Sequence, residues 1–266
     1  MTEPINIFIP AAGIGERLLP ITRHIPKPLL PIAGKPVLEI ILEKVSGLNL
    51  RDIGINLHHK RDALNDWISR SAFRQEVTTF TEDPILGTGG ALRNAQGFLA
   101  RGAFLVHNAD ILSDIDLGRL LDAHITSGNL ATLAVHDFPQ FNTVALDAMG
   151  FVKGIGELPA ERRVAFTGIA VYNPEFLGFL PEGASSVVDA WLAAELSGHR
   201  IGTFDVSGCY WHDIGTPSAY AAAVIDAMRS EGETVFIHPS VEGCRNAQMD
   251  GYVILEKQCR LPKGVS

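Results

Sequence analysis

The sequence predicts an α/β fold: a Rossmann-like, doubly wound sheet, mostly parallel but mixed, with helices on both faces. Short β-branched apolar runs alternate with segments of helical period through the first half of the chain, and the first run leads into a loop rich in glycine and proline. Strands that alternate with helices of this length are typical of a mainly parallel sheet covered on both sides. We expect residues 1–233 to form this domain.

The first half of the chain supplies most of the expected sheet. Ile5–Ile9 is β-branched and aromatic and stops at Pro10, which predicts a buried first strand. The glycine- and proline-rich loop follows over residues 11–34. Apolar spacing then predicts helices over 37–45, 61–71, 89–99 and 117–127, and strands over 52–57, 77–80, 103–106 and 130–135.

The pattern changes after Val135. A hairpin is expected over 143–146 and 151–155, around Met149 and Gly150, followed by a strand over 164–172 and a helix over 187–196. Residues 210–214 and a helix over 218–229 return the chain to the main body. From residue 234 the apolar positions lose helical period and lie among Gly, Pro and Cys, which predicts a short β-rich tail over 234–266, the start of a β-helix.

Composition excludes several classes of protein. The net charge of −8 argues against a nucleic-acid groove, which needs clustered Lys and Arg. No apolar run reaches 18 residues, and the first four residues lack the basic region of a signal peptide. The three cysteines are widely spaced and form no CxxC pair, which favours a reducing, cytoplasmic compartment. We expect no membrane partner, and a monomer or small homo-oligomer.

The loop after the first strand has the chemistry of a phosphate site. Gly13 and Gly15, behind Ala11 and Ala12, let the backbone approach an anion and direct N–H groups at its oxygens. Arg17 adds a guanidinium suited to a triphosphate. Lys27 adds a compact cation between two prolines that fix the backbone on either side of it. Glycines alone would indicate no more than a tight turn, and the two cations make a phosphate site the better interpretation.

With these residues the chain resembles the sugar-1-phosphate nucleotidylyltransferase family over about its first 230 residues. The Gly-x-Gly-x-Arg-Leu, Pro-x-Thr and Pro-Lys-Pro parts of the family signature are all present between residues 13 and 28. Four later segments agree in order: 86–91 (LGTGGA), 108–110 (NAD), 167–169 (TGI) and 211–217 (WHDIGTP). Within the family the chain looks most like uridylyl- and guanylyltransferases, such as those for N-acetylmuramate, heptose or mannose 1-phosphate.

The resemblance implies the reaction and its residues. A sugar 1-phosphate would attack the α-phosphorus of a nucleoside triphosphate, GTP or UTP favoured, and release pyrophosphate with Mg²⁺ as cofactor. The implied catalytic residues are Arg17, for the β- and γ-phosphates, and Lys27, for the attacking phosphate; Asp110 and Asp213 would bind the metal. The implied nucleotide-binding residues are Ala11, Ala12, Gly13, Gly15, Gly87, Thr88, Gly89, Gly90 and Asn108, and the implied sugar-phosphate-binding residues are Glu157, Thr167 and Gly168.

Several alternatives accompany this interpretation. Taken singly, Asp110 could cap a following element and Asp213 could be a turn residue. Family members often have Glu-Lys-Pro where this chain has Glu157-Leu158-Pro159, so another cation, Arg162 or Arg163, would have to assist the acceptor phosphate. A non-catalytic, ligand-sensing protein of the same fold is the second hypothesis. A nicotinamide-dependent oxidoreductase is excluded, because the loop lacks the third glycine and the second strand ends without an acidic residue.

Overall fold

A computed structural model describes residues 3–156, 160–244, 249–257 and 259–261. In these ranges nine strands form one mixed sheet. Its strands are β1 (Ile5–Pro10), β4 (Leu50–Leu57), β5 (Val77–Thr81), β6 (Phe104–His107), β8 (Ala131–His136), β9 (Val144–Leu146), β10 (Val152–Ile155), β11 (Arg162–Tyr172) and β12 (Ile201–Asp205). The helices are α1 (Val37–Ser46), α2 (Arg61–Arg70), α3 (Gly87–Asn94), α4 (Gln96–Leu99), α5 (Leu117–Ser127), α6 (Val187–Leu196) and α7 (Pro217–Ser230).

The sheet is parallel at one end and mixed at the other. The main strand order is β10-β9-β11-β6-β1-β4-β5, with β8 beside β11 and β12 beside β8. Strands β6, β1, β4 and β5 are parallel, whereas β11 runs antiparallel to β6, β8 and β9. Sequence order runs outward from β1 to β4 and β5, then returns to β6 on the other side of β1. Ligands of open α/β sheets bind at such a reversal point, beyond the carboxyl ends of the strands.

Helices cover both faces, as predicted. In β1 the side chains of Ile7 and Ile9 enter one apolar cluster and that of Phe8 enters the other, as the alternation of a strand requires. The first cluster includes buried residues of α1, α2, α5 and α7, and the second includes residues of α3, α4 and α6. None of the helices in the described ranges is both long and apolar enough to cross a membrane.

Two details differ from the expectations. The helix expected over 89–99 begins at Gly87 and is interrupted at Ala95, which separates α3 from α4. Strand β12 was not expected at all; it is short and pairs in parallel with β8. The hairpin expected around Gly150 is confirmed as β9 and β10, and Gly150 adopts a positive φ of 83° that favours glycine.

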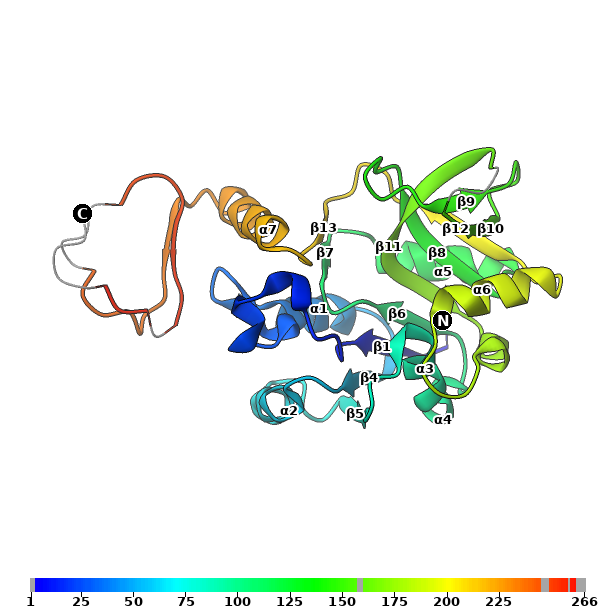
Figure 1. Cartoon of the computed structure of the whole chain (residues 1–266), viewed down its shortest axis with the longest axis horizontal. Coiled ribbons are helices and arrows are strands. Elements are labelled where there is room, and N and C mark those ends of the chain that lie inside the picture. The colour runs from blue at the N-terminus through cyan, green and yellow to red at the C-terminus, as the bar shows by residue number, and fades with distance from the viewer. Residues whose placement is uncertain (1–2, 157–159, 245–248, 258, 262–266) are drawn as a thin grey trace.

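Short elements complete the chain. They are β2 (Pro31–Ile32), β3 (Lys35–Pro36), β7 (Ile111–Ser113), β13 (Trp211–Asp213), β14 (Val235–Ile237) and β15 (Val253–Leu255), with 3-10 turns over Glu16–Leu18, Ile21–Arg23, Lys27–Leu29 and Pro174–Phe179. In Figure 1, α7 leads from the sheet to the tail, on the opposite side of the molecule from the β9–β10 hairpin.

The described part of the tail is built of parallel β-pairs. Val235 pairs with Val253, and a bridge joins Glu242 to Arg260 at the same sequence offset. The tail also contacts the body, because the Gly34 N–H donates to Glu256 Oε1 at 3.0 Å. A regular offset between parallel rungs supports the β-helix prediction. The domain boundary at residue 233 and the assignment to a β-helix stay predictions.

Candidate active site

The loop after β1 folds back on itself at Gly15. This glycine has a φ of 71°, and a Cβ on it would lie 2.9 Å from Thr22 Cγ2. Thr22 Oγ1 donates to the Gly15 carbonyl at 2.9 Å, which closes the loop. A Cβ on Gly13 would meet no described atom within 4 Å, so open space lies above this part of the backbone. Glycine at 15 is explained by the fold, whereas glycine at 13 leaves room for a ligand.

Four charged side chains converge beyond the carboxyl ends of β1 and β6. Lys27 Nζ donates to Asp110 Oδ2 and lies 3.8 Å from Asp213 Oδ1. Arg17 lies 3.9 Å from Asp213 Oδ2. The Lys27 side chain is only 12% exposed, whereas that of Arg17 is 67% exposed and free to reach a ligand. The residues expected for the triphosphate, the acceptor phosphate and the metal therefore form one cluster.

A short antiparallel pair brings the two distant aspartates together. Strand β13 pairs with β7 so that Asp213 lies opposite Ile111, and the Ile214 N–H donates to the Asp110 carbonyl at 3.0 Å. Beyond Ile214, a Cβ on Gly215 would lie 2.5 Å from an Arg17 nitrogen and 2.8 Å from Asp213 Oδ1, so a side chain there would displace these two charged groups. The segment around 211–217 therefore places the second aspartate.

The cluster has the electrostatics of a cation site. Burial raises the pKa of the Asp213 carboxyl and the neighbouring Asp110 carboxylate raises it further, while Lys27 and Arg17 act in the opposite direction. Asp213 Oδ1 is buried without a hydrogen-bond partner. Within the described residues no group of three or more His, Cys, Asp or Glu side chains gathers around a metal position. Two carboxylates, one of which has an oxygen that accepts no hydrogen bond, fit Mg²⁺, which takes few protein ligands and keeps waters and substrate phosphates.

A pocket of about 270 Å³ opens on one side of Asp110. Its lining includes Ala12, Gly13, Gly87, Thr88 and Asn108, five of the residues expected to bind the nucleotide. The remaining lining residues are Pro10, Asn56, Glu82, Ile85 and Asp110. The pocket thus joins the loop after β1 to the turn at the start of α3.

The other glycines of the 86–91 segment have a packing role. Gly89 and Gly90 are buried, and a Cβ on Gly89 would lie 2.9 Å from the Ser186 carbonyl oxygen. The Gly89 N–H donates to the Ser185 carbonyl at 2.9 Å. Both glycines therefore let α3 approach the segment before α6, and they lie against residues 183–186 and not among the residues that line the pocket.

Asn56 and Glu82 line the pocket, although the sequence did not predict them as site residues. Asn56 Nδ2 donates to Glu82 Oε1 at 2.7 Å, and Asn56 Oδ1 accepts from the Ala11 N–H at 2.6 Å. Glu82 Oε2 accepts from the Leu86 N–H at 2.8 Å. This buried network connects both loops of the pocket. Its signal in the sequence is a polar residue at the end of each of two neighbouring strands, where a parallel sheet places ligands.

Strand β11, where the sugar phosphate is expected, pairs with β6, the strand that precedes Asp110. Gly168 has a φ of 82°; its carbonyl accepts from the Asn108 N–H at 2.9 Å, and a Cβ on it would lie 2.9 Å from Asn108 Nδ2. Thr167 is fully buried, and its hydroxyl donates to the Ala134 carbonyl at 2.8 Å. The Thr167 side chain is therefore engaged with the backbone of the sheet.

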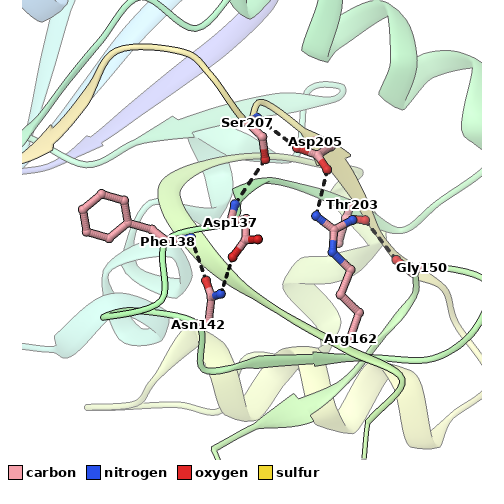
Figure 2. Close-up of polar contacts among 8 residues, drawn as sticks. All are labelled: Asp137, Phe138, Asn142, Gly150, Arg162, Thr203, Asp205 and Ser207. Atoms are coloured by element: carbon pink, nitrogen blue, oxygen red, sulfur yellow. Dashed lines mark hydrogen bonds and ion pairs between the residues drawn. The ribbon is translucent and has the colours of Figure 1, made fainter.

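The cation expected to replace the missing lysine is not identified by the contacts. Glu157 and the two residues after it lie outside the described residues. Arg162 donates to Asp205 Oδ2 at 3.1 Å, and Arg163 donates to the Gly156 carbonyl. Figure 2 shows the Arg162 guanidinium directed at Asp205. Arg162 is thus engaged on the outer part of the sheet.

Comparison with known proteins agrees with this geometry. Residues 7–230 match the family model described as nucleotidyl transferase. A mannose-1-phosphate guanylyltransferase of Mycobacterium tuberculosis is 28% identical over 260 residues, covering 93% of this chain and 70% of that protein. A UTP–glucose-1-phosphate uridylyltransferase of Synechocystis is also 28% identical over 260 residues, covering 90% of this chain and 67% of that protein.

Solved structures share the fold. HddC from Yersinia pseudotuberculosis, complexed with GMP-PN, has a TM-score of 0.69 at 23% identity and covers 84% of this chain and 99% of that chain. UDP-glucose pyrophosphorylase from Acinetobacter baumannii has a TM-score of 0.74 at 19% identity and covers 86% of this chain and 98% of that chain. The resemblance inferred from the motifs is confirmed, and the chain belongs to the nucleotidyl transferase family.

Proposed function

We propose that this protein transfers a nucleotidyl group from a nucleoside triphosphate, GTP or UTP, to a sugar 1-phosphate. The observation that carries the proposal is the convergence of Lys27, Asp110 and Asp213, with Arg17 at its open side, beside the pocket at the carboxyl ends of β1 and β6. Such a site can hold two polyanions together and offset their charge, and catalysis of phosphoryl transfer rests mainly on this positioning and electrostatic stabilisation.

Each group has a defined part in the proposed reaction. An oxygen of the sugar phosphate forms a bond to the α-phosphorus, the bond from that phosphorus to the bridging oxygen breaks, and pyrophosphate leaves. Arg17 would neutralise the β- and γ-phosphates, and Lys27 would hold the attacking phosphate. Asp110 and Asp213 would hold Mg²⁺, which when bound supplies positive charge to the oxygens of the α-phosphate. Because the nucleophile is the substrate's own phosphate, no covalent enzyme intermediate is needed.

The pocket supports GTP ahead of UTP. Glu82 lines it, and a carboxylate only accepts hydrogen bonds; beyond those from Asn56 and Leu86 it has further lone pairs to offer. Guanine presents two neighbouring donors, N1–H and the N2 amino group, whereas uracil presents one N–H between two carbonyl oxygens. Kinetics with each nucleoside triphosphate and one sugar 1-phosphate should give a higher kcat/KM for GTP than for UTP, and a higher value for UTP would refute this preference.

The test of the reaction is pyrophosphate release with Mg²⁺, four nucleoside triphosphates and a broad panel of sugar 1-phosphates. Asp110→Asn keeps the shape of the side chain and removes its charge, so turnover should be lost while the melting temperature is retained. Asp122→Asn, on the exposed face of α5, is the matched control and should keep wild-type turnover. Wild-type turnover in Asp110→Asn would show that Asp110 is not a metal ligand.

A ligand-sensing protein of the same fold is the competing hypothesis. A sensor has no need of a partly buried acidic pair beside two cations, and this chain keeps all four groups in contact range. No pyrophosphate release across every base and sugar, together with tight binding of a nucleotide sugar, would favour the sensor. The family and its named relatives support a role in nucleotide-sugar biosynthesis. A role in the cell envelope, a cytoplasmic location and a monomer or small homo-oligomer stay predictions.

A further inference from the structure

We propose that three aromatic side chains next to the charged cluster form a platform that binds the sugar ring of the acceptor. Phe138 and Phe141 lie in the loop between β8 and β9, and Trp211 lies in β13; together they are called the aromatic platform. The centroids of the two phenyl rings are 5.5 Å apart at an angle of 20°, and each lies 5.8 Å from the Trp211 ring. This inference rests on the proposed function and deepens it.

The platform is unusual in its exposure. Phe138 and Phe141 are 37% and 42% exposed, although the rings are large and apolar. Aromatic side chains stabilise a protein most when they are buried, so a stacked, exposed pair leaves apolar surface available to a ligand. Buried His136 lies beneath it, with its ring 5.3 Å from that of Phe138 and 4.6 Å from that of Trp211. One side of the platform is therefore fixed to the sheet and the other is open.

The platform is joined to the proposed metal pair by two strands. Trp211 and Asp213 are two residues apart in β13, so the pleat directs their side chains to the same face. Trp211 Nε1 donates to the Thr167 carbonyl at 2.9 Å, and the adjacent Gly168 carbonyl accepts from the Asn108 N–H at 2.9 Å. The rings thus lie next to the strand segment where the acceptor is expected.

The order of the subsites points to the sugar as the occupant. The pocket proposed for the nucleotide includes none of the three platform residues among its lining. Asp110 lines that pocket, whereas Asp213 lies in the same strand as Trp211. In an in-line displacement the attacking phosphate enters opposite the leaving pyrophosphate, so the sugar extends away from the triphosphate. A pyranose ring has faces of C–H groups that pack on aromatic rings, while its hydroxyls remain at the edge.

The loop that carries the phenyl rings is held in place by its own polar groups. The Phe138 N–H donates to Asn142 Oδ1 at 2.9 Å, and Asn142 Nδ2 donates to Asp137 Oδ1 at 2.6 Å. The Asp137 N–H donates to Ser207 Oγ at 3.2 Å. Figure 2 shows this network, with the Phe138 ring directed away from it. A loop ordered before binding loses little conformational entropy when the ligand arrives.

The test is steady-state kinetics of the double variant Phe138→Ala/Phe141→Ala with the best sugar 1-phosphate and triphosphate. Ring contacts that are equal in the ground and transition states affect KM and leave kcat unchanged. We expect KM for the sugar 1-phosphate to rise about tenfold, with kcat and KM for the triphosphate within about twofold of wild type. In the reverse reaction, KM for the nucleotide sugar should rise and KM for pyrophosphate should not.

Two control variants separate ring contact from general damage. Phe138→Tyr/Phe141→Tyr keeps both rings and should keep KM close to wild type, and Leu196→Ala, at an 84% exposed position of α6, should leave every constant unchanged. If the double alanine variant does not fold, Phe141→Leu replaces it, because leucine is apolar but offers no flat face. An unchanged KM for the sugar 1-phosphate overturns the platform.

Three further outcomes also overturn it. One is an equal rise in KM for the triphosphate and the sugar 1-phosphate. Another is a change in oligomeric state together with the kinetic loss, which would make the platform an interface between copies of this chain. The third is an absence of turnover in the wild-type protein with every sugar 1-phosphate, which would refute the proposed function as well. Normal wild-type turnover with unaffected variants would refute the platform alone.

Discussion

Replacing Asn56 with alanine should remove the contact that joins the two loops of the pocket proposed for the nucleotide. The variant leaves the buried Ala11 N–H and Glu82 Oε1 without the amide that bonds both. A buried group that loses its partner costs about 1–3 kcal/mol, so the free energy of unfolding should fall by about 2–6 kcal/mol. At this chain length the melting temperature should fall by ~5–20 °C. Denaturant unfolding measures the loss directly.

The network also predicts a rescue. Asn56→Asp alone places a second carboxylate against Glu82 and should destabilise the protein. Combined with Glu82→Gln, the pairing is restored: the new amide donates to the new carboxylate, and the Ala11 and Leu86 N–H groups keep their acceptors. The double variant should therefore be more stable than either single one. The reasoning is refuted if Asn56→Ala stays within about 0.5 kcal/mol of wild type, as the exposed control Asn65→Ala should.

Two further predictions follow from the site. Gly215→Ala adds a Cβ 2.5 Å from an Arg17 nitrogen, so kcat/KM for the triphosphate should fall by up to about a hundredfold. The control Gly97→Ala, with open space around it, should leave kcat/KM unchanged. Equal values of kcat/KM in the two variants would contradict this prediction. Burial lowers the pKa of His107 to about 4, so the unfolded chain binds the proton more tightly and stability falls as pH drops from about 6.5 toward 4. In His107→Leu the free energy of unfolding should fall by about 3 kcal/mol less than in the wild type between pH 6.5 and pH 4. Parallel pH profiles of this free energy in the two proteins would contradict the prediction.

The sequence predicted the parts of the fold that have a simple period. The buried run at Ile5–Ile9, the hairpin at Gly150 and all the expected helices but that over 89–99 were found near their expected bounds. The spacing of apolar residues within each segment is enough to predict these elements, and their tertiary contacts agree with that spacing. Ala95, which interrupts the expected 89–99 helix, shows the limit of the method, because nothing in the local spacing marks that break.

The sequence motifs proposed the charged residues of the candidate site and did not identify two of its polar residues. Motifs identified Lys27, Asp110 and Asp213, but they do not show that β13 pairs with β7 and so brings the aspartates together. Asn56 and Glu82 were missed because their role depends on two parallel strands ending side by side, which no single segment reveals. A glycine motif likewise does not show that Gly87 lines the pocket as well as packing against Ser185, whereas Gly89 and Gly90 serve packing.

The central claim is that the α-phosphate of the nucleotide passes directly to a sugar 1-phosphate at the Lys27, Asp110 and Asp213 cluster. The most direct measurement is transfer of an α-phosphate radiolabel from GTP, with Mg²⁺ and the acceptor panel. We expect labelled nucleotide sugar in one-to-one amount with pyrophosphate. No labelled product should form without acceptor, and none in Asp110→Asn or Asp213→Asn. Pyrophosphate released without label in a sugar product, or label transfer undiminished in those variants, would contradict it.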